Sequence, residues 1–438
     1  MHNETTLAGS STTGTIRRDH KRAALASTVG TTVEWYDFFI YAQAAAVVFA
    51  ELFFAPMGGA GQIVAYVTVG ISFVFRPLGA VLAGYFGDRV GRKAVLVATL
   101  TMMGVATVAI GFLPTYASIG IWAPIALVVL RIVQGFSTGG EWGGAALMAV
   151  EHAPSTRRGL FGASTQLGVP LGMLLATATL TLCTIFTTDE QFREWGWRLP
   201  FLISVALIGI GFYIRRRVEE SPVFVELSER KQRSHAPLRT LLREHPRRVL
   251  LAALSFVGTN GNGYMVIGGF LVAYVSKAHG IARTELLLAT LASAVVWGLA
   301  TIAGAAWSDV AGRTRVMNVG NALMALFAIP FFLLVDTGSI VTIYLAMMTF
   351  AVGLGLSYGP QPALFAETFP AAIRYSGASI AYAIGAILGG AFVPTVSQWL
   401  LTATGSTTAI GYYLAALAVI SFAATWAIRD RSQVDLSA

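Results

Sequence analysis

The chain has 438 residues, of which 55% are hydrophobic and only 12% are charged. A soluble domain usually carries about 25% charged residues, so this composition excludes an ordinary soluble protein and indicates an integral membrane protein. The net charge of +8 comes from basic residues placed mostly between apolar runs, which indicates membrane topology rather than nucleic-acid binding.

Twelve apolar runs, mostly about 20 residues long, can cross a bilayer as helices. We expect them at about 23–54, 60–86, 94–113, 118–150, 159–186, 198–214, 248–276, 285–308, 315–335, 338–366, 375–402 and 407–428. The sequence therefore predicts an all-α integral membrane protein with two six-helix halves. These parts would be an N-terminal tail (1–22), an N-terminal half (23–214), a charged linker (215–247), a C-terminal half (248–428) and a C-terminal tail (429–438).

The 30 Lys and Arg residues are distributed unevenly between the two sides of this arrangement. One side holds the N-terminal tail, the linker and most other basic loops, whereas the opposite loops hold only Arg193, Arg198, Lys277 and Arg283. Because basic loops stay on the cytoplasmic side, both termini are expected in the cytoplasm. The protein is expected to be a multi-pass protein of the cytoplasmic (plasma) membrane.

Short motifs recur in the two halves and indicate an internal duplication. Glu151-x-x-Pro-x-x-x-Arg158 returns with the same spacing as Glu367-x-x-Pro-x-x-x-Arg374. The loop sequence Asp88-Arg-Val-Gly91-Arg92 is echoed by Asp309-Val-Ala-Gly312-Arg313. Each match lies at an equivalent helix end, so the halves are expected to share one topology.

Several longer strings carry a resemblance to a known family. Gly84-Tyr-Phe-Gly-Asp88-Arg89-Val-Gly91-Arg92-Lys93 resembles the loop 2–3 signature of the major facilitator superfamily. Glu34-Trp-Tyr36-Asp37-Phe, Arg76-Pro-Leu-Gly and the run 131–144 resemble its metabolite:proton symporter group, whose members carry shikimate, α-ketoglutarate, citrate, dicarboxylates, or proline and betaine. The resemblance implies the major facilitator fold. The second loop signature departs from the pattern, with Ala305 and Val310 in place of a glycine and a basic residue.

The resemblance also implies a gate of charged residues at the cytoplasmic ends of the helices. Such a network would favour the outward-open state, whereas the alternative is solvated loop pairs worth about 0–1 kcal/mol each. The candidate gate residues are Gly84, Asp88, Arg89, Gly91, Arg92, Lys93, Glu151, Arg158, Asp309, Gly312, Arg313, Glu367 and Arg374.

Five charged residues fall inside predicted helices of the N-terminal half: Glu34, Asp37, Arg76, Arg131 and Glu141. An isolated charge there costs at least about 2.5–3.5 kcal/mol, so these groups should pair or face water. Acids outnumber bases by one, which leaves one carboxyl able to carry a proton. Asp37, about 20 Å from the inner helix end, is the expected carrier and Glu34 the alternative. The competing interpretation is a static polar lock.

Arg131 offers a planar fork that fits a substrate carboxylate. The other candidate cavity residues are charged or polar groups of both halves: Arg76, Gln134, Glu141, Tyr36, Asn260, Asn262, Tyr264, Tyr358 and Gln361. The residues of the C-terminal half, from Asn260 onward, could equally form interhelical hydrogen bonds.

The expected function is proton-coupled secondary active transport (symport), by alternating access, that imports a small polar metabolite, an organic carboxylate or a zwitterion. A proton-coupled exporter and a non-transporting membrane sensor are the alternatives. An enzyme is not expected, because the sequence shows no metal cluster, nucleophile–base motif or phosphate-binding loop. The lone Cys183 excludes a disulfide within the chain. We expect no cofactor or metal, partners limited to substrate, protons and lipid, and a monomer.

Overall fold

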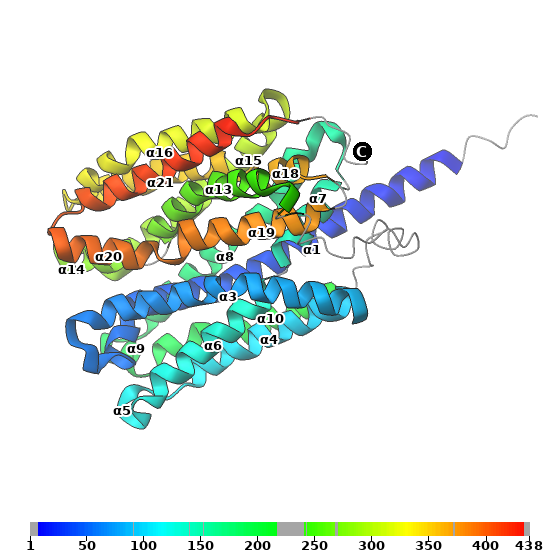
Figure 1. The fold of residues 1–438 in the computed structure, drawn as a ribbon. Helices are drawn as coiled ribbons and strands as arrows, with labels where there is room; N and C mark the ends of the chain where they lie inside the picture. Colours follow the sequence, from blue (N-terminus) through cyan, green and yellow to red (C-terminus); the bar gives the residue numbers. More distant parts are fainter. Residues whose placement is uncertain are drawn as a thin grey trace, which may run out of the picture.

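The computed structural model describes residues 8–90, 92–139, 141–151, 153–216, 241, 243–267, 270–370 and 373–432. Side chains are outside this description at 8–24, 26, 83–96, 148, 214–216, 264 and 266–267. Every regular element in the described ranges is a helix, and the long helices run roughly parallel or antiparallel to one another (Figure 1).

The first group of helices spans the chain up to residue 216. Its long members are α1 (Ala8–Ala44), α3 (Gly61–Val90), α4 (Arg92–Phe112), α6 (Trp122–Thr138), α7 (Glu141–Glu151), α8 (Arg158–Phe186) and α10 (Leu199–Arg216). Short elements join them: η1 (Ala45–Phe49), α2 (Ala50–Leu52), η2 (Ala55–Ala60), α5 (Tyr116–Ile119), η3 (Ser155–Arg157), α9 (Asp189–Glu194) and η4 (Gly196–Arg198).

The second group begins at residue 246. It contains α13 (Pro246–Ile267), α14 (Phe270–His279), α15 (Arg283–Ala311), α16 (Arg313–Val335), α17 (Ile340–Tyr358), α18 (Gln361–Thr368), α19 (Arg374–Ala386), η6 (Ile387–Ala391), α20 (Val393–Thr404) and α21 (Thr408–Ala427). Most of the predicted linker, 217–240, lies outside the described residues.

Within the described residues, nine helical stretches are long and apolar enough to cross a membrane. They are 55–82, 122–151, 155–186, 196–213, 283–311, 313–335, 340–368, 374–404 and 408–427. The remaining apolar helix of α4, Val97–Phe112, is shorter. In Figure 1, α1 begins and α21 ends at the same end of the bundle, beside α7 and α18, while α5, α14 and α20 lie at the other end.

Glycines set how closely the helices approach. A Cβ atom on Gly135 would collide with the carbonyl oxygen of Ser72, and one on Gly139 with that of Arg76, so α6 packs directly on the backbone of α3. A Cβ atom on Gly172 of α8 would lie 2.8 Å from the backbone nitrogen of Tyr36 on α1. Without a hydrophobic effect inside lipid, such close backbone contacts hold helices together.

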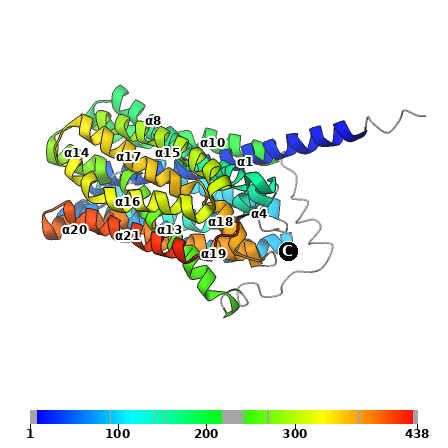
Figure 2. The same ribbon diagram turned by 90° about the horizontal axis from the view of Figure 1, so that it is seen from above.

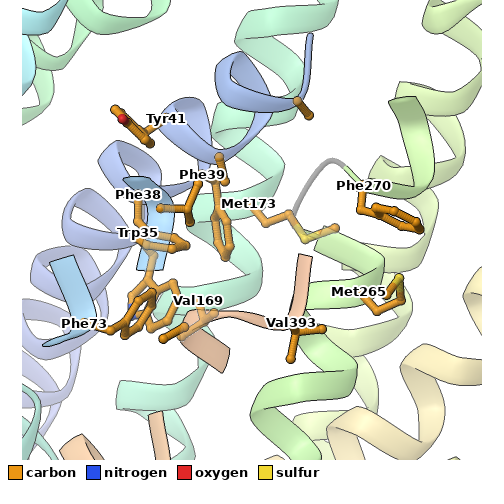
Figure 3. Packing of buried hydrophobic residues seen from close by; sticks show 14 of the residues in the cluster. Trp35, Phe38, Phe39, Tyr41, Phe73, Val169, Met173, Met265, Phe270 and Val393 are labelled. Carbon is orange, nitrogen blue, oxygen red and sulfur yellow. The ribbon is translucent and has the colours of Figure 1, made fainter. Parts of the chain in front are cut away.

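The two groups meet mainly where α8 packs on α15, with further contacts of α7 with α19 and of α3 with η6. Figure 2 shows the same bundle from above. A buried hydrophobic cluster continues across the junction: Figure 3 shows Trp35, Phe38 and Phe73 of the first group, with Met173 pointing toward Met265 and Phe270 of the second. The apolar core is therefore continuous across the junction of the two groups.

Some of the predicted apolar runs are interrupted in the structure, where one run is divided into two helical segments. The run 118–150 divides into α6 and α7, and 338–366 divides into α17 and α18 at Gly359-Pro360. The first run turns from α-helix to π-helix at η1. Pro360 and Pro362 lack the backbone N–H that would continue the hydrogen bonds of α17, which explains the break before α18.

Candidate functional site

The charged residues expected inside the membrane gather in one place. Glu34 and Asp37 of α1, Arg76 of α3 and Arg131 of α6 line one small cavity, and each is at most 5% exposed. The cavity has a volume of about 10 Å³, enough for the centre of a single water molecule. A small organic molecule does not fit in it while the surrounding helices keep this arrangement.

The remaining cavity wall is Phe38, Ser72, Met103, Gln134 and Thr138. Gln134 was predicted. Ser72, Met103 and Thr138 were not, because single hydroxyl and thioether side chains in apolar runs carry no signal of the direction in which they face.

The side chain of Arg131, on α6, forms hydrogen bonds with the neighbouring helix α3. Its Nε donates to the carbonyl oxygen of Thr68 at 3.2 Å, and its Nη2 donates to Val69 O at 3.0 Å and to Ser72 Oγ at 2.8 Å. The guanidinium carbon also lies 3.9 Å from the centre of the Tyr41 ring. The close α3–α6 contact thus places a fully buried cation where helix carbonyls can stabilise it.

Asp37 connects to Arg131 through two intermediate side chains. Arg131 Nη1 donates to Gln134 Oε1 at 2.7 Å, Gln134 Nε2 donates to Thr107 Oγ1 at 2.7 Å, and Thr107 Oγ1 donates to Asp37 Oδ2 at 2.9 Å. The other oxygen, Asp37 Oδ1, accepts no hydrogen bond from the described residues. Sequence reasoning missed Thr107, which lies in the otherwise apolar α4.

Glu34 pairs with Arg76, with 3.7 Å between Oε1 and Nη1. The Arg76 guanidinium lies 4.4 Å from the centre of the Phe73 ring and 5.6 Å from that of Trp35. This pair gives Glu34 a basic partner, whereas Asp37 is reached by a hydroxyl donor. Glu141 is buried on α7 but is not part of the cavity wall.

The other predicted polar residues lie elsewhere. Tyr36 donates its hydroxyl to Pro200 O at 2.8 Å, away from the cavity. Asn260 donates to Ala386 O at 3.2 Å, and Asn262 donates to Gly258 O at 2.8 Å, so both amides bind backbone. The side chain of Tyr264 lies outside the described residues.

A polar and aromatic bridge joins the two groups of helices. Trp142 of α7 stacks on Tyr382 of α19 with ring centres 3.9 Å apart. Its Nε1 donates to Gln166 Oε1 at 3.0 Å, and Gln166 Nε2 donates to Gln361 Oε1 and to Tyr358 O, both at 3.1 Å. The structure thus places Tyr358 and Gln361 in contacts between the groups, not in the cavity.

The predicted gate is visible in part. Asp309, at the end of α15, accepts hydrogen bonds from the backbone nitrogens of Gly159 at 2.8 Å and Leu160 at 3.0 Å, at the N-terminus of α8. Arg313 lies 2.6 Å from Asp309 and 3.2 Å from Glu367. A carboxylate at a helix N-terminus is stabilised by the helix dipole.

A further pair crosses between the groups, with Arg374 Nη1 3.2 Å from Glu151 Oε1. Arg158 is buried close to this cluster, and Gly312 has φ +95°, which only glycine adopts without strain. The side chains of the first loop signature, Gly84, Asp88, Arg89, Gly91, Arg92 and Lys93, lie outside the described residues.

Comparison with known proteins gives a consistent result. The model of the Major Facilitator Superfamily matches residues 28–374 and 258–437. An inner membrane metabolite transport protein of Escherichia coli, YhjE, is 40% identical over 409 residues, covering 92% of each chain. The shikimate transporter of Escherichia coli is 38% identical over 421 residues, covering 94% of each chain.

A similar solved structure is the proton:xylose symporter XylE of Escherichia coli. It superposes with a TM-score of 0.76 over 94% of this chain and 97% of that one, at 18% identity. At that identity the likeness concerns the fold.

Proposed function

This chain belongs to the major facilitator superfamily, a family of membrane transporters, and we propose that it works as a proton-coupled symporter that imports a small polar metabolite. The proposed substrate is an organic carboxylate or a zwitterion, carried by alternating access in a monomer. The protein is a multi-pass membrane transporter and not an enzyme.

The observation that carries the proposal is the cavity around Asp37. Asp37 is a buried carboxyl group in a cavity that two arginines also line. Burying an ionisable group inside the membrane costs free energy, so such a group is by default a candidate functional residue. Glu34 has Arg76 as its partner, whereas a hydroxyl donates to Asp37. Asp37 is therefore the proposed proton carrier, with Glu34 as the alternative.

Twelve membrane crossings complete the proposed architecture. α1, α4 and the pair α13–α14 would add three crossings to the nine apolar stretches of the described residues. The halves would be 23–214 and 248–428, joined by the linker 215–247. The start of α1 and the end of α21 lie at the same end of the bundle (Figure 1), in accord with an even number of crossings. The basic loops favour cytoplasmic termini.

The proposed gate is the cluster at the α7/α18 end. Contacts of Asp309 with the N-terminus of α8, and of Glu151 with Arg374, join the two halves there. They would stabilise the outward-open and occluded states and break when the protein opens inward. Asp88 and its neighbours would act in the same way at the symmetry-related position.

Arg131 is the proposed ligand of the substrate carboxylate. A shikimate transporter among the relatives fits a carboxylate substrate, because shikimate carries such a group. In the C-terminal half, Asn260, Asn262, Tyr264, Tyr358 and Gln361 would recognise uncharged substrate groups once the bridge between the halves opens.

Uptake by the purified protein in liposomes tests the proposal. An inward proton gradient should drive accumulation of at least one member of a panel of organic acids, betaines and amino acids, and collapsing the gradient should abolish it. Efflux of preloaded compound in exchange for entering protons would support export instead. Accumulation that is independent of the pH gradient would refute proton coupling.

A further inference from the structure

The row of hydrogen bonds between Arg131 and Asp37 has a direction. It crosses from α6 through α4 to α1, and its four side chains, Arg131, Gln134, Thr107 and Asp37, are all at most 4% exposed. A guanidinium can only donate, so it fixes the amide of Gln134 with its oxygen toward Arg131. The amide nitrogen then faces Thr107 and donates to it.

Thr107 has one hydrogen to give. Because its oxygen already accepts from Gln134, that hydrogen can go to Asp37 Oδ2 at 2.9 Å or to Met103 O at 3.0 Å. A carboxylate is the stronger acceptor of the two, since hydrogen bonds to ionised groups are roughly twice as strong as neutral ones. As long as Arg131 holds Gln134, a hydroxyl donor is therefore directed at Asp37 and favours its ionised form.

We propose that Gln134 and Thr107 form a relay through which the contacts of Arg131 set the protonation state of Asp37. The inference rests on the proposed function. When Arg131 turns to a substrate carboxylate, Gln134 loses the donor that fixes its amide. The amide can then rotate and accept the hydrogen of Thr107. Asp37 then loses the hydrogen bond from Thr107 and binds a proton that arrives by way of the cavity; the reverse sequence releases it. In this relay, Gln134 and Thr107 act by positioning the hydrogen bond to Asp37.

Other charged groups near Asp37 do not supply this switch. Glu34 lies three residues away on α1 and pairs with Arg76 of α3. Glu141 lies on α7, outside the cavity wall. The described side chains of α4, 97–112, include no titratable group, so the hydroxyl of Thr107 is the contribution of that helix.

Infrared difference spectroscopy of the full-length protein in liposomes tests the relay without any substrate. A carboxyl band that titrates with pH and is absent in Asp37→Asn reports on Asp37. Thr107→Val keeps the side-chain shape and removes the hydroxyl. This removal should move the midpoint of the band to higher pH by about one unit or more. Thr107→Ser should return the midpoint to that of the unchanged protein.

Thr101→Val is the matched control, because Thr101 lies on the same helix, is exposed and donates its hydroxyl to Val97 O of that helix. It should leave the midpoint unchanged. If Thr107→Val does not fold, Thr107→Ala replaces it. Equal midpoints in Thr107→Val, or in that replacement, and in Thr101→Val would overturn the relay. The relay would also be overturned if Asp37→Asn removes no titrating band.

A transport arm separates the relay from symport itself. With shikimate, or whichever organic acid accumulates in the liposome panel, uptake by Thr107→Val should show a pH profile displaced upward, and Thr107→Ser should restore the profile. An infrared shift without accumulation of any compound would support the relay and refute symport. Accumulation in the unchanged protein, with identical profiles for Thr107→Val and Thr101→Val, would support symport and refute the relay.

Discussion

Asp37 and Glu34 are both buried carboxyl groups of α1, but among the described side chains only Glu34 has an arginine at ion-pair distance. Asp37→Asn keeps the shape of the side chain and removes its titratable group. We expect this variant to lose proton-driven accumulation while it still exchanges substrate across the membrane, because exchange needs no net proton movement. Counterflow and gradient-driven uptake in liposomes measure the two activities separately.

Glu34→Gln is the comparison for that variant. It removes the partner of Arg76, so it should lower the stability of the protein, since an unpaired buried charge is costly. If Glu34→Gln abolishes accumulation and Asp37→Asn preserves it, Glu34 is the carrier. If accumulation survives in both variants and in the double variant, the proton takes another route or the protein is a uniporter.

Arg131 binds through a planar fork that a lysine cannot reproduce. Arg131→Lys keeps the positive charge, but its three N–H donors cannot replace the four hydrogen bonds that Arg131 gives to Thr68, Val69, Ser72 and Gln134. We expect the affinity for a carboxylate substrate to fall about 10- to 100-fold, the loss of one or two charge-assisted hydrogen bonds. Binding of a neutral analogue should change less, and calorimetry with both compounds would show the difference.

Two aspartates cap helices at the α7/α18 end, and they allow a comparison of elements. Asp309 binds the N-terminus of α8 across the junction of the two groups. Asp430 binds Thr314 at the N-terminus of α16, through the backbone nitrogen and the hydroxyl, both at 3.1 Å, within one group. Asp309→Asn should shift the population toward the inward-open state about tenfold. Accessibility of a cysteine placed in the cavity measures that shift.

Asp430→Asn is the matched change, because it removes the same kind of charge without touching the other group of helices. It should lower the free energy of unfolding by about 1 kcal/mol and leave the conformational equilibrium unchanged. An equal shift in both variants would mean that any charge lost at this end opens the protein, and Asp309 would have no special place in the gate.

The effect of Asp430→Asn on stability should depend on pH. Burial by itself raises the pKa of Asp430, but hydrogen bonds from Ser432 and Thr314 outweigh it and lower the pKa below its usual range. A group with a depressed pKa stabilises the fold above its unfolded value, about pH 4, and this stabilisation is lost as the pH falls through the folded value. The difference in Tm between the unchanged protein and Asp430→Asn should therefore be full at pH 6 and shrink below pH 4.

The helices could be predicted from the sequence because length and hydrophobicity are local properties. Their breaks were harder: Gly359-Pro360 signals the end of α17, whereas the π-helical turn of η1 depends on packing. At the site, Glu34, Asp37, Arg76, Arg131 and Gln134 were predicted as charged or amide groups in apolar runs. Thr107 was missed, because a single threonine in a helix satisfies its hydroxyl on its own backbone as readily as on a neighbour.

The topology of the whole molecule is tested with single cysteines on a background in which the buried Cys183 is replaced by alanine. The loop glycine Gly120 has φ +59°, so the neighbouring Ser118 is the better outer position. Ser118→Cys should react with an impermeant reagent only from outside the cell, and Glu244→Cys only from inside. Reaction of both from one side would contradict the three crossings expected between these positions, and reaction from the reversed sides would contradict the proposed orientation.

The central position of Asp37 has an electrical consequence. The residue lies near the middle of the expected membrane-crossing run 23–54. A unit charge that crosses the whole membrane gains about 2.3 kcal/mol per 100 mV. A proton that stops at Asp37 crosses about half of that field, so it gains about half of that energy on arrival. Voltage would then act on proton binding itself, and the cell would load this carboxyl group more readily when its membrane is more strongly polarised.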